Sequence, residues 1–260
     1  GTRENHSVSC LLEKHCGIHR RMRSNQFKCV FFDWDLTLVR VLGDISPEER
    51  LTALFQKEGI PYTLREVQDA VRRYQHELQT GKIKRTQNQQ TQRDITRYYQ
   101  DVLAHLNHSD RNWERATYLY NAYAHLPQLA YEDTIPMLQA LQAKGLKLGI
   151  ISNHSRLIRP VVEEMLGEYI APELIVISQE LRVHKPSKTI YRLACLRAQE
   201  APSDCAFVGN DLFVDAIGAV KEGEFGLGIW LDRQESTHNL SALPNGMVRV
   251  TRLQDVLDYV

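Results

Sequence analysis

Short apolar segments recur along the chain and alternate with longer amphipathic ones. Five apolar runs are rich in β-prone residues: 29–32 (CVFF), 146–152 (LKLGIIS), 174–178 (LIVIS), 205–209 (CAFVG) and 225–231 (FGLGIWL). Uninterrupted runs of this length are typical of strands that are buried on both faces of a parallel sheet. We therefore expect these runs to form the strands of one core.

Helical patterns separate the apolar runs. They cover 134–144, which ends before Gly145, then 160–166 in a helix begun near Ser155, and finally 187–197 and 213–221. A glycine directly after a helical pattern is a favourable stop. This alternation predicts an α/β fold with a Rossmann-like, doubly wound parallel sheet as its core. Ligands of such sheets bind beyond the carboxyl ends of the strands.

The segment 44–128 has a different character, with many Gln, Arg, Tyr and Leu residues and few β-prone runs. Ser46 followed by Pro47 reads as a helix start, and Thr63 with Glu66 forms a capping box for a second helix. Amphipathic patterns at 91–106 and 112–124 predict two more helices. We expect a helical cap over 44–128, a core over 27–43 and 129–260, and a flexible N-terminal extension over 1–26.

Composition narrows the class of protein but not its activity. The 260 residues carry 32 basic and 32 acidic side chains, so the net charge gives no argument for binding nucleic acid or a membrane surface. Five scattered cysteines without a CxxC pair fit a reducing compartment, and Cys29 and Cys205 read as small core residues. No apolar run reaches membrane-spanning length, and 1–26 lacks a secretory h-region. We expect a cytoplasmic protein.

Four motifs with chemically useful side chains follow strands or precede helices. Asp33-Trp34-Asp35-Leu36-Thr37 follows the first run, and Ser152-Asn153 closes LKLGIIS. Lys185-Pro186 precedes the 187–197 helix, and Gly209-Asn210-Asp211 with Asp215 follows CAFVG. Alternate residues of a strand point to one side, so Asp33 and Asp35 are expected to face one small volume. Two such acids repel each other unless a cation lies between them or one keeps its proton.

In order and spacing, these motifs resemble the haloacid dehalogenase-like (HAD) superfamily, specifically its phosphatase branch with a helical cap inserted after the first motif. The resemblance covers about residues 27–235 and includes Tyr131-Glu132-Asp133-Thr134 before the strand LKLGIIS. It further includes Asp215-Ala216-Ile217-Gly218-Ala219 and Ile229-Trp230-Leu231-Asp232-Arg233. The resemblance implies a hydrolase that transfers a phosphoryl group to a carboxylate.

The roles implied by the resemblance can be assigned residue by residue. Asp33 would attack phosphorus, and Asp35 would protonate the leaving oxygen and later deprotonate the attacking water. Ser152, with the backbone N–H groups of Asn153 and His154, would hold phosphoryl oxygens at a helix N-terminus. Lys185 would supply positive charge against the developing anion. Mg²⁺ is the implied cofactor.

The implied metal ligands are Asp33, the backbone carbonyl of Asp35, and Asn210 or Asp211. The fourth motif often begins Gly-Asp, whereas here it begins Gly209-Asn210, and Asn210 offers an amide oxygen without negative charge. Which of Asn210, Asp211 and Asp215 completes the metal site stays open.

Each of these side chains also has an ordinary structural reading. Ser152 could be a simple helix N-cap, Lys185 alone would be a surface lysine, and Asp215 could be a first-turn acid favoured by the helix dipole. We expect Thr37 to support the loop through local hydrogen bonds.

The leading prediction is a Mg²⁺-dependent phosphomonoester hydrolase that acts on a small soluble phosphorylated metabolite. Two alternatives stay open: a phosphomutase that shares the first half-reaction, and a HAD-fold binding or regulatory protein without turnover. A dehalogenase is disfavoured because halide displacement needs no acid partner such as Asp35. We expect neither nucleic acid nor a membrane as partner. The sequence leaves the substrate and the oligomeric state undetermined.

Overall fold

The computed structural model describes residues 27–85, 91–108, 113–235 and 243–260. The predicted N-terminal extension, residues 1–26, lies outside these ranges. Within them, no helix combines the length and the apolar character that crossing a bilayer requires.

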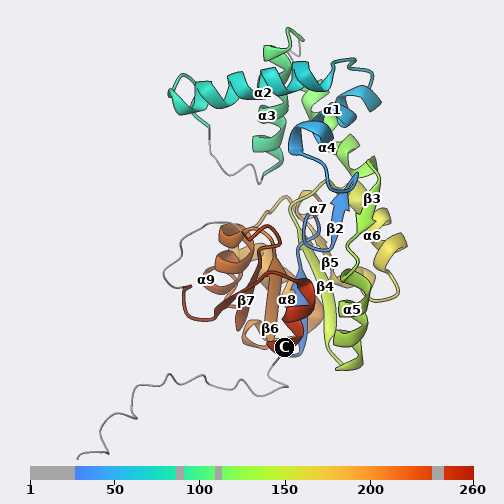
Figure 1. The fold of residues 1–260 in the computed structure, drawn as a ribbon. Coiled ribbons are helices and arrows are strands. Elements are labelled where there is room, and N and C mark those ends of the chain that lie inside the picture. The colour runs from blue at the N-terminus through green and yellow to red at the C-terminus, as the bar shows by residue number, and fades with distance from the viewer. Residues whose placement is uncertain (1–26, 86–90, 109–112, 236–242) are drawn as a thin grey trace, which may run out of the picture.

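A six-stranded parallel sheet forms the centre of the larger lobe (Figure 1). Its strands, in the spatial order β5-β4-β1-β6-β7-β8, are β1 (Cys29–Phe32), β4 (Lys147–Ser152), β5 (Ile175–Ile177), β6 (Cys205–Gly209), β7 (Leu227–Leu231) and β8 (Met247–Val250). All five strands expected from the apolar runs are present. β8 was not expected, because its MVRV sequence is short and is interrupted by Arg249. The predicted doubly wound α/β core is confirmed.

The sheet register brings the predicted motifs to one edge. Phe32, the last residue of β1, pairs with Ile150 of β4 on one side and with Val208 of β6 on the other. The chain then continues into Asp33, whose N–H donates to the Val208 carbonyl at 2.9 Å. Because the three strands run in the same direction, the loops that follow them emerge together at their carboxyl ends.

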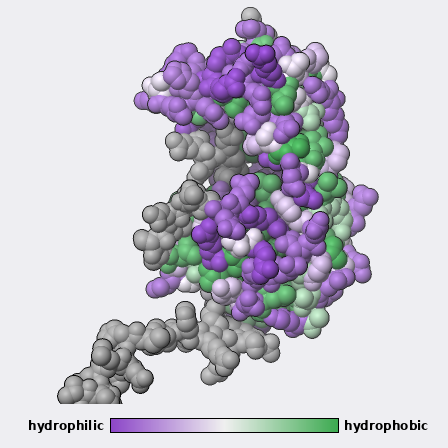
Figure 2. Space-filling model, in the orientation of Figure 1, coloured by the Kyte–Doolittle hydropathy of each residue, from purple (hydrophilic) through white to green (hydrophobic). Residues whose placement is uncertain are grey.

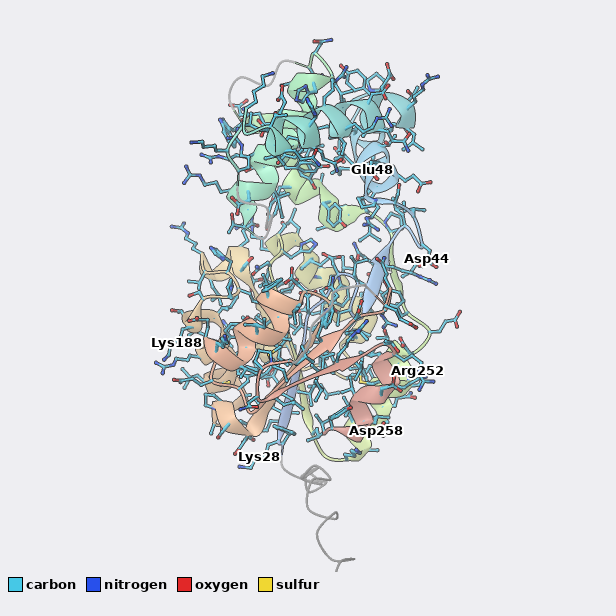
Figure 3. The ribbon with its side chains drawn as sticks, turned by 60° about the vertical axis from the view of Figure 1, so that its left-hand side comes forward. Lys28, Asp44, Glu48, Lys188, Arg252 and Asp258 are labelled. Carbon is cyan, nitrogen blue, oxygen red and sulfur yellow. The ribbon has the colours of Figure 1, made fainter. Side chains whose placement is uncertain are left out.

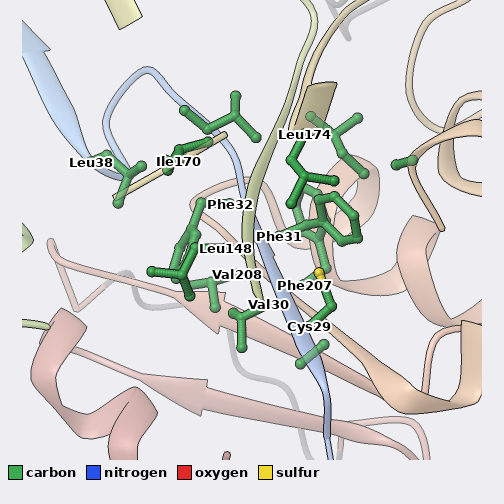
Figure 4. Packing of buried hydrophobic residues seen from close by; sticks show 14 of the residues in the cluster. Cys29, Val30, Phe31, Phe32, Leu38, Leu148, Ile170, Leu174, Phe207 and Val208 are labelled. Carbon is green, nitrogen blue, oxygen red and sulfur yellow. The ribbon is translucent and has the colours of Figure 1, made fainter. Parts of the chain in front are cut away.

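Side chains of β1 alternate between two apolar layers, so the strand is buried on both faces. Figure 4 shows Val30 and Phe32 on the side of Leu148 and Val208, with Cys29 and Phe31 pointing the other way. All four β1 side chains are fully buried. Packing on both faces therefore fixes the position of the end of β1.

Helices cover both faces of the sheet, with α5 and α6 on one side and α8 and α9 on the other (Figure 1). The helices of this lobe are α5 (Thr134–Ala143), α6 (Arg159–Leu166), α7 (Ser178–Leu181), α8 (Lys188–Ala198) and α9 (Gly218–Lys221). Shorter helical turns are η1 (Tyr123–His125), η2 (Arg156–Ile158), η3 (Pro172–Leu174), η4 (Pro202–Asp204), η5 (Leu212–Ile217, π-helical) and η6 (Leu253–Asp258). The helix predicted at 213–221 is therefore a π-helical turn continued by α9.

Four helices form a smaller lobe above the strand ends (Figure 1). They are α1 (Pro47–Lys57), α2 (Leu64–Gln79), α3 (Gln92–His105) and α4 (Glu114–Ala122). Ser46 and Thr63 cap α1 and α2 in complete capping boxes, which confirms both predicted helix starts. The lobe has its own apolar cluster, separate from that of the sheet. We call this lobe the cap.

A short antiparallel ribbon joins the two lobes. β2 (Val39–Val41) pairs with β3 (Gln128–Ala130) on the path into and out of the cap. Just beyond β2, Asp44 accepts a hydrogen bond from Arg40 at 2.5 Å, at the junction of the two lobes in Figure 3. Hydrophilic residues prevail on the face of both lobes that Figure 2 shows, with apolar residues scattered among them.

Candidate active site

The predicted site residues meet in one cavity at the carboxyl ends of the strands. This cavity, of about 160 Å³, is lined by Asp33, Asp35, Leu36, Ser152, Asn153, Lys185, Asn210, Asp211 and Asp215. We call it the carboxylate cavity. Of the predicted residues, only Thr37 does not line it; Thr37 is fully buried beneath and contacts Asn210.

Lys185 is the electrostatic centre of the carboxylate cavity. Its side chain is 2% exposed, and its Nζ donates to Asp33 Oδ1 and to Asp215 Oδ1, both at 2.7 Å. Burial lowers the pKa of Lys185, but the two carboxylates outweigh burial and the net shift is upward. Lys185 therefore remains charged and leaves Asp33 with one oxygen outside the ion pair.

Asn153 holds the Lys185 backbone from both sides. Its amide nitrogen donates to the Lys185 carbonyl at 3.0 Å, and its side-chain oxygen accepts from the Lys185 N–H at 2.7 Å. The position of Lys185 therefore depends on Asn153, which directly follows β4. The Asn153 side chain is engaged in this contact, so only its backbone N–H remains as a candidate anion donor.

The segment after β4 differs from the sequence-based expectation. The helix N-cap is Ser155, which accepts from the Leu157 N–H, so Ser152 ends the strand and caps no helix. The His154 N–H, expected to hold a phosphoryl oxygen, donates instead to Ser178 Oγ at 3.1 Å. Residues 153–155, which separate β4 from η2, account for both differences.

Asp35 lies at the boundary between cap and core, with 32% of its side chain exposed. Its Oδ1 atom is nevertheless buried without a hydrogen-bond partner among the described residues. Burial raises the pKa of Asp35, and the Asp33 charge adds to this shift, while His154 opposes it. A carboxyl group with a raised pKa keeps its proton to higher pH than an ordinary aspartate and is therefore suited to act as a proton donor.

Asn210 bridges the two acidic residues. Turned with its nitrogen toward them, its amide donates to Asp33 Oδ2 at 3.3 Å and to the Asp35 carbonyl at 3.1 Å. Turned the other way, its oxygen meets the same two oxygens and accepts from Thr37 Oγ1 at 3.3 Å. In this second orientation, the Asn210 amide oxygen, Asp33 Oδ2 and the Asp35 carbonyl oxygen lie close together. The orientation that the amide adopts depends on whether a cation lies among these oxygens.

Asp211 and Asp215 organise the loop after β6. Asp211 Oδ1 accepts from the N–H groups of Phe213 and Val214, which makes it the cap of η5. Asp215 Oδ2 accepts from the Asp211 N–H at 2.9 Å while its Oδ1 accepts from Lys185. A Cβ at Gly209 would overlap the Asp215 carboxylate, so this close approach requires glycine.

Sequence reasoning missed the side chains of His154 and Arg233 as members of this region. His154 Nε2 lies 3.5 Å from Asp35 Oδ2. Arg233 donates to both oxygens of Asp133 at 2.9 Å and to the Thr37 carbonyl at 3.0 Å, and it stacks on Tyr131. Arg233 was quoted only as part of a motif and His154 only for its backbone N–H, because neither residue type nor spacing indicates these side-chain contacts.

A comparison with protein families finds one match over most of the chain. A model of the haloacid dehalogenase-like hydrolases matches residues 27–223. An (S)-2-haloacid dehalogenase from Pseudomonas putida is 34% identical over 134 residues, covering 50% of this chain and 56% of that protein. A glyceraldehyde 3-phosphate phosphatase from Methanopyrus kandleri is 32% identical over 99 residues, covering 36% of this chain and 40% of that protein. These alignments span about half the length of the relatives.

Solved structures with similar folds cover nearly the whole chain. A HAD hydrolase from Bacillus subtilis bound to magnesium superposes with a TM-score of 0.64 at 16% identity, covering 88% of this chain and 96% of that one. A HAD phosphatase from Thermococcus onnurineus gives a TM-score of 0.55 at 21% identity, with the same coverage. At such identities the likeness establishes the fold.

Proposed function

Because the chain belongs to the haloacid dehalogenase-like hydrolase family, we propose that it hydrolyses a phosphomonoester through an aspartyl-phosphate on Asp33. The substrate is a small soluble phosphorylated metabolite. The observation that carries this proposal is the carboxylate cavity, in which Asp33, Asp35 and Lys185 lie together at the end of the central strand. Phosphoryl transfer needs such positioning and charge neutralisation more than it needs a strong base.

In the first step, an Asp33 carboxylate oxygen forms a bond to phosphorus while the bond to the leaving oxygen breaks. Lys185 already holds Asp33 Oδ1 at 2.7 Å, so the carboxylate is oriented before the substrate arrives. Asp35 gives its proton to the leaving oxygen. Its raised pKa favours this role, because the acid form persists to higher pH than for an exposed aspartate.

In the second step, water attacks the phosphorus of the aspartyl-phosphate and gives a proton to the ionised Asp35. The bond between phosphorus and Asp33 breaks, which releases inorganic phosphate and restores both carboxyl groups. Ser152, at the end of β4, and the backbone N–H of Asn153 are the groups that we propose to bind phosphoryl oxygens. His154 takes no part in that contact, because its N–H is bound to Ser178.

The residues present fit a magnesium ion. Asp33 Oδ2, the Asp35 carbonyl and the Asn210 amide oxygen can converge with separations of 3.1 and 3.3 Å from the Asn210 atom. Neighbouring ligands of an octahedral Mg²⁺ with bonds of about 2.1 Å lie about 3 Å apart. When bound, the ion would neutralise charge on the phosphoryl group and on Asp33. Asp211 serves as a helix cap, so Asn210 is the better candidate for the third protein ligand.

A second candidate activity comes from the relatives named (S)-2-haloacid dehalogenases. Their similarity makes carbon–halogen hydrolysis at Asp33 the alternative to test. A leaving halide needs no proton, and the placement of Asp35 beside Asp33 therefore favours an oxygen leaving group.

The test measures phosphate release from a panel of phosphomonoesters with Mg²⁺ and with EDTA. Chloride release from 2-chloropropionate is followed in parallel. Asp33→Asn is compared with Asp69→Asn, a matched change at a partly exposed carboxylate of the cap helix α2. We expect Mg²⁺-dependent phosphate release that Asp33→Asn abolishes and Asp69→Asn preserves. Phosphate release that survives Asp33→Asn contradicts the mechanism, and chloride release alone would assign the dehalogenase activity.

A further inference from the structure

A second cavity lies directly beyond the carboxylate cavity, between the cap and the core. It has a volume of about 230 Å³ and is lined by Asp35, Ile95, Tyr98, Tyr99, Tyr120, Tyr123, Asn153 and His154. We call it the tyrosine cavity. Asp35 and Asn153 line both cavities, so the two volumes meet at the proposed proton donor.

This junction defines which part of a substrate each cavity would hold. The phosphoryl group must lie against Asp33 in the carboxylate cavity, and the leaving oxygen must lie within reach of Asp35. The rest of the leaving group then extends past Asp35, away from Asp33. The tyrosine cavity is the volume that begins there.

The walls of the tyrosine cavity are aromatic and come mostly from the cap. Tyr98 and Tyr99 lie on α3 with their ring centroids 5.9 Å apart, and the Tyr123 ring centroid is 5.8 Å from that of His154. Tyrosine offers a flat apolar face and a polar tip. Such walls bind rings, because a ring can stack on one tyrosine while its substituents bond to the hydroxyl of another.

The charges that line the tyrosine cavity disfavour a leaving group that carries a negative charge of its own. Among its described lining residues, neither lysine nor arginine occurs, and Asp35 is the carboxylate at its floor. Burial raises the pKa of Tyr98, Tyr99 and Tyr123, so their hydroxyls stay neutral. The charge of His154 already faces Asp35 Oδ2 at 3.5 Å, so an anionic substituent next to the ester bond would lose its hydration without gaining a lysine or arginine as partner.

Two unsatisfied polar atoms point to a ligand at the floor of the tyrosine cavity. His154 is 4% exposed, and its Nε2 atom lacks a hydrogen-bond partner among the described residues, as does Asp35 Oδ1. Buried polar atoms without partners are uncommon and call for an explanation. The oxygen of a bound alcohol, set between these atoms, would satisfy both.

We propose that the tyrosine cavity binds the leaving group of the phosphomonoester and selects an uncharged alcohol that carries a ring. This inference rests on the proposed phosphatase activity and adds the substrate class. Beyond the tyrosine cavity, a cap cavity of about 540 Å³ shares Tyr98, Tyr99 and Tyr123 with it and includes Arg50. A longer alcohol would continue into that space, so the charge restriction applies to the part next to the ester.

The test uses phosphate esters that differ in one group. In 1-phenylethyl phosphate and phosphomandelate, a methyl group and a carboxylate occupy the same position beside the ester oxygen. Isopropyl phosphate lacks the ring, and acetyl phosphate reports the attack of Asp33 on a leaving group that needs no ring. We expect kcat/KM for 1-phenylethyl phosphate to exceed that for phosphomandelate and for isopropyl phosphate by at least about tenfold each.

A positive charge placed in the tyrosine cavity should weaken the preference for the uncharged ester. Ile95 lies in the first turns of α3 and lines this cavity. Ile95→Lys should raise the ratio of phosphomandelate to 1-phenylethyl phosphate kcat/KM by about tenfold, since an opposite unit charge at about 4 Å is worth on the order of 1–4 kcal/mol near a protein surface. Ile95→Met, an uncharged side chain of similar length, should leave this ratio near the wild-type value.

The outcomes separate this inference from the proposed function. Hydrolysis of acetyl phosphate together with a preference for phosphomandelate or isopropyl phosphate would overturn the inference and leave the phosphatase intact. Absence of acetyl phosphate hydrolysis would overturn the phosphatase. In that case, calorimetric binding of the phosphonates that correspond to 1-phenylethyl phosphate and phosphomandelate decides the charge preference, and tighter binding of the acid contradicts it.

Discussion

His154 Nε2 lies 3.5 Å from Asp35 Oδ2, in contact range but too far for a good hydrogen bond. The two residues are 119 positions apart and meet where the ends of β1 and β4 lie side by side. The imidazole lowers the pKa of Asp35 by its charge, against burial and Asp33, which raise it. His154 therefore limits how far burial and Asp33 raise the pKa of the proposed acid.

Replacing His154 should move the pH dependence of the reaction. In His154→Gln, the favourable charge is lost and the pKa of Asp35 rises further. The limb of the kcat profile that reports Asp35 should consequently move to higher pH, whichever step limits the rate. The profile is measured with 1-phenylethyl phosphate. His105→Gln, a histidine paired with Glu77 in the cap, is the control and should leave the limb in place; an unmoved limb in His154→Gln would remove this role.

Asp35→Asn should affect poor and good leaving groups differently. Without the acid, hydrolysis of an alkyl phosphate should fall by about 10²- to 10⁴-fold, which is the usual contribution of a positioned proton donor. p-Nitrophenolate leaves without a proton, but the second step still lacks its base. Rapid mixing with p-nitrophenyl phosphate should therefore give a burst close to one product per enzyme and then slow turnover. Equal losses for both esters, with no burst, would argue against two roles for Asp35.

Lys185→Met should destabilise the fold by about 3 kcal/mol at neutral pH, because removing one partner leaves buried carboxylates uncompensated. Burial raises the pKa of Asp215 to about 7, and Lys185 opposes that shift. A carboxyl whose folded pKa is raised costs stability that grows as the pH rises from its unfolded pKa of about 3.9 to the folded pKa, and this cost is lost again on acidification. The deficit should therefore shrink as the pH falls below about 7.

Urea unfolding of the Lys185→Met variant at several pH values checks this sign. The double variant Lys185→Met/Asp215→Asn provides the control, since it removes the charge that Lys185 neutralised. It should recover part of the lost stability at neutral pH. A deficit that grows on acidification would contradict the assignment of these groups.

Asn210→Asp should increase the affinity of the site for Mg²⁺. The substitution adds one negative charge where Asn210 approaches Asp33 Oδ2 and the Asp35 carbonyl. We expect the Mg²⁺ concentration for half-maximal activity to fall by roughly tenfold, since a unit charge at about 4 Å is worth on the order of 1–4 kcal/mol near a protein surface. Titration of EDTA-treated enzyme with Mg²⁺ provides the measurement. An unchanged midpoint would place the ion elsewhere.

Much of the core could be predicted because the sequence patterns that indicate its strands and helix starts involve neighbouring residues. β6 matches the apolar run 205–209 residue for residue, and the capping boxes of Ser46 and Thr63 rest on neighbours three positions away. The motif residues were expected at strand ends, and parallel strands bring such ends together whatever the details of packing. The residues that line the carboxylate cavity could therefore be predicted from the sequence.

The remaining features depend on contacts between distant segments. The side chains of Tyr98 and Tyr120 line a cavity with His154 only because the cap folds over the strand ends, and no periodicity indicates how a helix is rotated toward another lobe. The His154 N–H was assigned to phosphate because the sequence does not show that the helical turn η2 begins only at Arg156. β2 and β3 escaped detection because each has three residues and pairs across the whole cap.

The ribbon of β2 and β3 has a consequence for how this enzyme can diversify. The chain enters the cap after Val41 and returns at Gln128, and these two residues are paired with each other. The entire helical lobe is thus attached through two adjacent points, and the six-stranded sheet is complete without it. One lobe could be exchanged for another while Asp33, the proposed nucleophile, stays in register, so new substrates could be acquired without rebuilding the proposed reaction.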